Sequence, residues 1–305
     1  PHLGSFLGPP TRTCSMAAAQ AALVFLGLLL SPSAAVAGAE TKANLTAKAN
    51  QTVPRSLESS NVQAVEVQSH SQKAILVQES AAATGAESTS RTSFSFRNVV
   101  AEFIAMTLFV FVGCGSAMSI AKDEGSAWVL QVSLTFGLAI TALAYTVGHY
   151  SGAQINCAVT FGLVIYGHIS VLQGFVNFLG QMLGSVLGAV LLKIMYPEGK
   201  DKTGGLATNS VAPGWTSGGA LIGEFMGTFL LMYVVFETAV NSMAAANAAV
   251  APLAIGLSVF LAHSVLIPVD GCSINPTRTF GPALIDSMHG GGSFKDMWVF
   301  WLGPL

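Results

Sequence analysis

Hydrophobic residues are concentrated in five runs along the second two-thirds of the chain, and each run is long enough to cross a lipid bilayer. The runs cover about residues 99–120, 128–147, 171–192, 220–240 and 248–267. A helix needs about 20 predominantly apolar residues to span the hydrocarbon core. A sixth run, 297–305, is too short to span. The pattern predicts an all-α membrane protein whose sixth helix is truncated.

Two further apolar segments, 156–166 and 275–285, are about half as long as the others. Each is too short to cross a bilayer and too apolar for a loop exposed to water. Irregular backbone at membrane depth is tolerated where protein buries it or where it lines a water-filled cavity. These segments therefore predict two re-entrant half-helices.

The order of long and short runs occurs twice. Ala-Glu-Phe at 101–103 opens the first run and Gly-Glu-Phe at 223–225 opens the fourth, and an asparagine begins each later short segment, at Asn156 and Asn275. Three spans per repeat is an odd number, so the second copy must enter the membrane from the opposite side. Matching interrupted segments in an inverted repeat indicate a site near the middle of the membrane.

Glu102 and Glu224 open the first and fourth runs, and a carboxylate there is costly in lipid without a partner. A proton relay is one interpretation, but no Lys or Arg lies inside the five runs to pair with them. We favour a structural role, in which each carboxylate accepts hydrogen bonds from the backbone of the neighbouring re-entrant loop.

Gly180, Gly184 and Gly188 recur at every fourth position of the third run and so share one helix face. Small residues with this spacing let another backbone approach closely. An oligomer contact and a crossing within the chain both fit, and the crossing is favoured.

Composition agrees with a membrane protein. The 305-residue chain is 52% hydrophobic and 9% charged, whereas soluble domains carry about 25% charged residues. A net charge of −2 excludes a strongly basic nucleic-acid-binding protein. The few polar residues form no acid–base pair, nucleophile elbow or metal-ligand pattern, so no enzyme, cofactor or metal site is expected. The four cysteines, Cys14, Cys114, Cys157 and Cys272, are interpreted as packed thiols.

The N-terminal third has a different character. An apolar stretch at 21–30, followed by Ala-Val-Ala at 35–37, predicts that residues 1–37 are a leader with a signal or targeting segment. Residues 38–95 are rich in Ala, Ser, Thr, Gln and Glu without a regular period, and we expect them to be disordered. Two glycosylation sequons in this segment begin at Asn44 and Asn50.

The two asparagines suggest a function. An asparagine before a short helix is a good N-cap, because its side-chain oxygen accepts a backbone N–H and its NH₂ group is then held in a fixed direction. Two half-helices from opposite faces bring both NH₂ groups and both positive helix ends together. Water that accepts from two such donors turns its hydrogens outward, which opposes proton hopping, and the positive field disfavours cations. We therefore expect a passive channel for small neutral molecules.

These residues give the chain, from about residue 99 onward, a strong resemblance to the aquaporins of the major intrinsic protein family. The matching motifs are the two Glu-Phe pairs, VGHYSGAQIN at 147–156 and GCSINPTR at 271–278. The resemblance implies a channel domain over 96–305, with six tilted helices, two re-entrant half-helices and a pore in each subunit of a homotetramer.

The resemblance also implies a selectivity filter on the outer side of the asparagines, made by Phe136, His263, Cys272 and Arg278. An aromatic residue with histidine is typical of water-selective members, whereas glycerol facilitators have a small residue for the histidine and an aspartate after the arginine, where this chain has Thr279. The implied function is a water channel that excludes protons and ions. A broader channel for hydrogen peroxide, ammonia or urea and a non-conducting structural membrane protein are the alternatives.

The motif neighbours Cys157, Ala158, Pro276 and Thr277 depart from the family pattern at two positions. Cys157 replaces the proline of the first motif, and Thr277 replaces the alanine of the second. Proline at the first helical position presets φ, so we expect a retained pore with a looser first loop.

The resemblance places both termini in the cytosol, whereas a cleaved signal would send the N-terminus into a lumen. Charge does not decide between them: Arg91 and Arg97 precede the first span, but Lys193, Lys200 and Lys202 gather in the expected outer loop. The prediction is a multi-pass protein of either the plasma membrane or an organelle.

Overall fold

The structure is a computed structural model, and it describes residues 94–123, 125–197, 199–292 and 294–305. The predicted leader, both sequons and nearly all of the predicted low-complexity segment lie outside the described residues. Within them there are helices and no strand. Five of the described helices are long and apolar enough to cross a membrane, which confirms the predicted all-α membrane fold.

The helices follow the hydrophobic runs closely. The long ones are α3 (Phe96–Ile120), α4 (Trp128–Ser151), α6 (Val171–Met195), α7 (Ser217–Val235) and α8 (Ala251–Asp270). The short ones are α5 (Cys157–Ile165), α9 (Pro276–Ser287) and α10 (Met297–Leu302). Each predicted half-helix is thus a separate short helix, and the sixth run forms the short helix α10.

Capping residues determine where several of these helices start. Ser95, Ser170 and Thr216 each accept a backbone N–H of the first turn of α3, α6 and α7. These caps satisfy amide groups that have no partner within the helix. With these caps α3 and α7 begin before their apolar runs, at Phe96 and Ser217, while α6 begins with its run at Val171.

The fourth and fifth spans, Ser217–Val240 and Ala248–Asp270, agree with the predicted runs, but they are not α-helical throughout. After α7 the chain forms a π-helical turn, Phe236–Val240, and then a 3₁₀ segment, Ser242–Val250. Asn241 caps the 3₁₀ segment by accepting the N–H of Met243. Pro252 in the first turn of α8 then favours a new helix start, because its missing N–H would lack a helical partner anyway.

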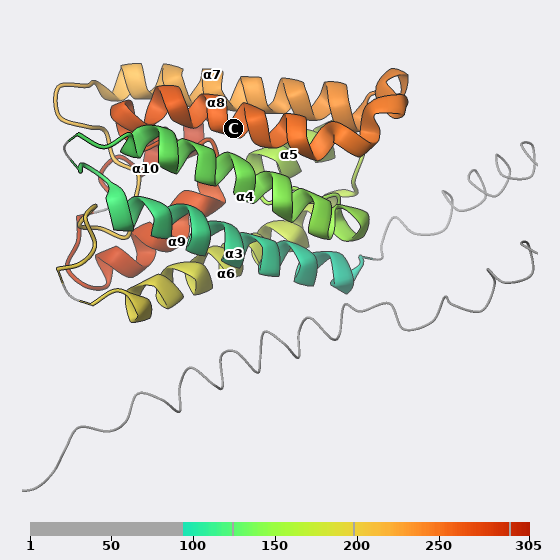
Figure 1. Cartoon of the computed structure of the whole chain (residues 1–305). Helices are drawn as coiled ribbons and strands as arrows, with labels where there is room; N and C mark the ends of the chain where they lie inside the picture. Colours follow the sequence, from blue (N-terminus) through green and yellow to red (C-terminus); the bar gives the residue numbers. More distant parts are fainter. Residues whose placement is uncertain (1–93, 124, 198, 293) are drawn as a thin grey trace, which may run out of the picture. The chain divides into compact units, whose positions relative to one another are not determined.

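The helices of the two repeats pack in corresponding ways. In the first repeat α3 packs on α6, and in the second α7 packs on α8 and α10. The repeats meet where α4 crosses α8, while α9 lies on α6 (Figure 1). In Figure 1, α9 lies toward the end of the bundle that holds α10, and α5 lies toward the opposite end. This is the arrangement expected for half-helices of an inverted repeat.

The glycine face of α6 packs against the backbone of α3. A Cβ atom added to Gly180, Gly184 or Gly188 would lie 2.4–2.8 Å from a carbonyl oxygen of α3, those of Val99, Phe103 and Thr107. Such distances are too short for any side chain, so only glycine fits at these three positions without moving the helices apart. The face therefore serves a crossing within the chain, as favoured from the sequence.

Candidate functional site

The loops that lead into the two half-helices have the same backbone conformation. Gly152 and Gly271 end α4 and α8 in the left-handed region, with φ of 83° and 84°. In each loop the residues three and one before the asparagine also have positive φ, at Ala153 and Ile155 and at Cys272 and Ile274. Non-glycine residues in this region are strained and persist where the surroundings hold them. The surrounding contacts must therefore fix both loops.

Glu102 is the main anchor of the first loop. One carboxylate oxygen accepts the backbone N–H of Gln154 at 2.9 Å, and the other accepts that of Ile155 at 2.7 Å. The hydroxyl of Ser151 and the side-chain amide of Gln181 donate to the same carboxylate at 2.5 and 2.8 Å. The group is fully buried. It satisfies loop amides that would otherwise be costly to bury.

Glu224 has the matching position in the second loop. Its two oxygens accept the backbone N–H groups of Ser273 and Ile274 at 2.7 and 2.6 Å. Glu224 is also fully buried. Both carboxylates thus make the loop-supporting contacts that the structural interpretation of the sequence expects.

Asn156 and Asn275 cap the two half-helices. The side-chain oxygen of Asn156 accepts the N–H of Ala158 at 2.9 Å, and that of Asn275 accepts the N–H of Arg278 at 3.1 Å. A cap of this kind fixes the plane of the side-chain amide and so the direction of its NH₂ group.

Each asparagine NH₂ group also crosses to the opposite loop. Asn156 donates to the carbonyl of Ile274 at 2.7 Å, and Asn275 donates to the carbonyl of Ile155 at 2.7 Å. An amide NH₂ carries two hydrogens, so each group has a second hydrogen for another acceptor. The structure therefore brings together two oriented donors from residues far apart in the sequence.

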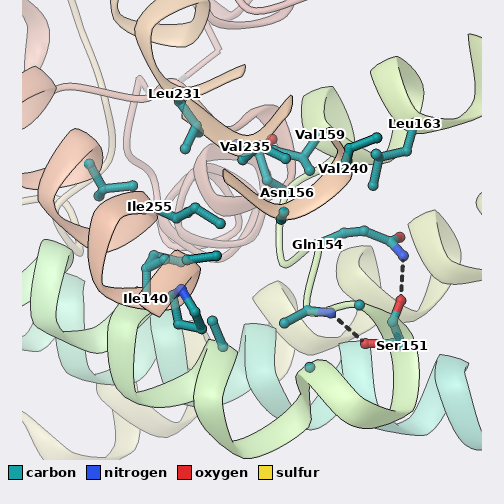
Figure 2. A pocket seen from close by; sticks show the side chains of 18 of the residues that line it. Ile140, Ser151, Gln154, Asn156, Val159, Leu163, Leu231, Val235, Val240 and Ile255 are labelled. Atoms are coloured by element: carbon teal, nitrogen blue, oxygen red, sulfur yellow. Dashed lines mark hydrogen bonds between the residues drawn. The ribbon is translucent and has the colours of Figure 1, made fainter. Parts of the chain in front are cut away.

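A cavity of about 530 Å³ leads to these asparagines. Tyr145 and His149, near the end of α4, line it together with both asparagines and His263. Most of its wall is apolar. Figure 2 shows Asn156 among side chains that include Ile140, Val235 and Ile255, which come from α4, α7 and α8. The site is a mostly apolar cavity with polar groups at defined points, a form typical of binding and transport sites.

Phe136 contacts two of the other three predicted filter residues. The rings of Phe136 and His263 stack with centroids 4.3 Å apart, and the guanidinium carbon of Arg278 lies 5.1 Å from the centroid of Phe136. All three side chains are buried. The fourth, Cys272, is buried in the loop before α9, where its N–H donates to a carboxylate oxygen of Asp270 at 2.9 Å.

Arg278 and His263 are each held by hydrogen bonds, and each keeps one nitrogen without a partner. Arg278 donates through Nη1 to the carbonyl of Ala207 and to the side-chain oxygen of Asn209, at 3.1 and 2.5 Å. The Nδ1 of His263 lies 2.9 Å from the carbonyl of Val259 and must be its donor. Within the described part of the chain, Nε of Arg278 and Nε2 of His263 have no hydrogen-bond partner.

A neutral histidine ring carries one hydrogen, on either of its two nitrogens. Since Nδ1 carries the hydrogen, Nε2 of the neutral ring is an acceptor. The cluster therefore offers a donor from Arg278 and an acceptor from His263, rather than two donors.

Two functional contributors were missed from the sequence. Asn209 lies in an irregular polar loop and gave no periodic signal, yet it positions Arg278. Gln181 did have a signal, because polar residues recur at every fourth position of α6, at 173, 177, 181 and 185. Its side-chain amide joins Glu102 to Thr160 at the start of α5.

The described ranges contain no group of three or more His, Cys, Asp or Glu residues placed to hold a metal ion. The polar side chains of the asparagine pair and of the cluster around Phe136 are amides, one guanidinium and one imidazole.

Comparisons with known proteins agree with this architecture. The family model described as "Major intrinsic protein" matches residues 88–305. Aquaporin-1 of Sus scrofa is 42% identical over 216 residues, which cover 68% of this chain and 77% of the relative. Aquaporin-2 of Homo sapiens is 41% identical over 209 residues, covering 68% and 73%.

Among solved structures, the aquaglyceroporin from Plasmodium falciparum shares the fold. Its TM-score is 0.61 at 23% identity, over 68% of this chain and 89% of that one. The family match covers most of the chain, and its range of residues 88–305 contains both half-helices. The chain therefore belongs to the major intrinsic protein family of multi-pass membrane channels, which are not enzymes.

Proposed function

We propose that the protein is a passive water channel that excludes protons and ions. The observation that carries this proposal is the pair of asparagine NH₂ groups, each fixed by a helix cap and a cross-loop bond at the cavity. The aquaporin relatives support a channel for water.

Proton exclusion follows from the direction of these donors. A water molecule between Asn156 and Asn275 accepts their remaining hydrogens through its oxygen, so its own hydrogens point along the passage in opposite directions. A proton hopping along the file would need a different orientation. The positive ends of α5 and α9 also face this point and raise the energy of any cation there.

The cluster of Phe136, His263 and Arg278 supports selection for water over larger solutes. The stacked rings present one side of the passage as a rigid wall. The donor of Arg278 and the acceptor of His263 together match a molecule that both accepts and donates. The guanidinium charge repels cations, and the narrow ring excludes polyols such as glycerol.

Stopped-flow light scattering tests the proposal with the full-length protein in proteoliposomes. We expect osmotic shrinkage well above that of protein-free vesicles, low glycerol uptake and no proton conductance. Water flux equal to that of empty vesicles would contradict the channel and favour the structural alternative. Glycerol flux comparable to water flux would contradict water selectivity, and parallel uptake assays with hydrogen peroxide, ammonia and urea test the broader channel.

We also propose that the protein works as a homotetramer in the bilayer, as the resemblance implies. Large apolar side chains on the long helices are exposed in the single chain, among them Leu183, Ile222 and Val265 at 65%, 67% and 69%. Lipid or neighbouring subunits would cover such a surface. Native mass spectrometry of the detergent-solubilised protein tests the assembly, and a monomer at all protein concentrations would contradict it.

A further inference from the structure

The two departures from the family motifs contact one another. The backbone N–H of Cys157 donates to Oγ1 of Thr277 at 3.3 Å, from the first residue of α5 to the second residue of α9. Both residues are buried, at 6% and 0% exposure, so neither the N–H nor the hydroxyl can turn to bulk solvent. This hydrogen bond joins the two half-helices at their starts.

The hydroxyl of Thr277 also contacts Asn275, one of the two capping asparagines. It donates its own hydrogen to Oδ1 of Asn275 at 2.7 Å. That oxygen also accepts the N–H of Arg278 at 3.1 Å, so two donors fix the amide plane of Asn275. The equivalent oxygen of Asn156 accepts the backbone N–H of Ala158.

The repeat supplies an internal comparison. In the second half-helix the position of Cys157 is held by Pro276, and in the first half-helix the position of Thr277 is held by Ala158. Proline has no N–H, and alanine has no hydroxyl. Cys157, which has an N–H, thus lies opposite Thr277, which has a hydroxyl. At the equivalent positions of the repeat, Pro276 lacks the N–H and Ala158 lacks the hydroxyl.

We propose that Cys157 and Thr277 are a matched pair, in which the Thr277 hydroxyl satisfies the Cys157 N–H and positions the side-chain amide of Asn275. Thr277 is then a positioning residue, because it acts on the pore through Asn275. The cysteine contributes through its backbone N–H rather than through its thiol. The loop expected from the sequence to be looser is instead joined to its partner.

The pair predicts that either single change is worse than both together. Thr277→Ala leaves the buried N–H of Cys157 without an acceptor. Cys157→Pro places the ring Cδ where the N–H pointed, well inside van der Waals contact with Oγ1 of Thr277. The double variant removes both the N–H and the hydroxyl and so removes both faults.

A double-mutant cycle on the melting temperature of the purified full-length protein tests the contact. We expect each single variant to melt about 3 °C or more below the unmodified protein, and the double variant to melt within about 1 °C of it. Cys157→Ala keeps the N–H, and Thr277→Ser keeps the hydroxyl, so both controls should retain the melting temperature. Additive losses, with the double variant below either single one, would overturn the matched pair.

The positioning role needs a second measurement, and it rests on the proposed water channel. In proteoliposomes we expect Thr277→Ala to lower the ratio of water permeability to proton leak several-fold, and Thr277→Ser to restore it. If the melting cycle shows coupling but Thr277→Ala leaves the ratio of water permeability to proton leak unchanged, Thr277 does not position Asn275. If the unmodified protein conducts no water, the proposed function fails, while the melting cycle still decides the contact between the half-helices.

Discussion

The imidazole of His263 is held by two different contacts. Its Nδ1 bonds the carbonyl of Val259 one turn earlier in α8, and its face stacks on Phe136 of α4. The first contact leaves Nε2 as the nitrogen without a partner, and the second holds the ring against Phe136. Under the proposed function, the width and the polarity of the filter therefore depend on the same side chain.

We predict that His263→Ala admits glycerol while water still passes. Removing the imidazole opens the space beside Phe136 and removes an acceptor, so a bulkier solute fits. Glycerol uptake by proteoliposomes should rise several-fold over that of the unmodified protein. Leu261→Ala is the matched control, because Leu261 lies on the same helix with 52% of its surface exposed. Continued exclusion of glycerol by His263→Ala would argue against this ring as the filter.

Helix α6 supports both half-helices along one polar stripe. The side-chain amide of Gln181 donates to Thr160 of α5. The hydroxyl of Ser185 accepts the N–H of Gly281 of α9 at 3.1 Å, where a Cβ at Gly281 would come within 2.3 Å of the Ser185 backbone. Close backbone packing and buried hydrogen bonds therefore act together on this helix.

The crossing of α6 with α3 gives a stability prediction. Gly184→Val should destabilise the protein by about 3 kcal/mol, because a Cβ there would lie 2.4 Å from the carbonyl oxygen of Phe103 and the helices must separate. Leu183→Ala, at the exposed position next to it, should change stability by less than about 0.5 kcal/mol. Thermal unfolding in detergent measures both. Equal melting temperatures for the two variants would show that the crossing tolerates separation.

The two repeats meet across α4 and α8. Gly137 and Gly256 face one another there, and a Cβ at Gly256 would lie 2.5 Å from the carbonyl oxygen of Gly137 and 1.8 Å from the hydroxyl oxygen of Thr141. The distance between the repeats therefore depends on these glycines. Each repeat supplies one asparagine, so the distance between the repeats also determines whether the two NH₂ groups can lie close together.

We predict that Gly256→Val reduces water permeability more than lipid-side changes on the same helix. A branched side chain pushes the repeats apart and strains the cross-loop bonds of both asparagines. Water flux per reconstituted protein should fall at least several-fold, with a lower melting temperature. Leu257→Ala, at a residue with 48% of its surface exposed, is the control. Normal flux with Gly256→Val would mean that the asparagine pair does not depend on this packing distance.

Much of the fold could be predicted because its signals are local. Apolar runs of spanning length, half-length runs and capping asparagines are each visible within about twenty residues, and their duplication indicated the inverted repeat. The π turn after Val235 was not predictable in this way, because the run over 220–240 extends through it and its two polar residues, Glu237 and Thr238, do not distinguish a π turn from an α-helix.

By itself, the sequence determined the helices, the two-fold repeat and the residue types that could act in a channel, since hydrophobic period and capping operate between near neighbours. The tertiary structure decided which distant groups meet. It is the tertiary structure that lets the N–H of Cys157 donate to the hydroxyl of Thr277 and the guanidinium of Arg278 donate to Asn209. No periodic pattern encodes such pairs, because a hydrogen bond depends on positions fixed to within a few tenths of an ångström by the packing of whole helices.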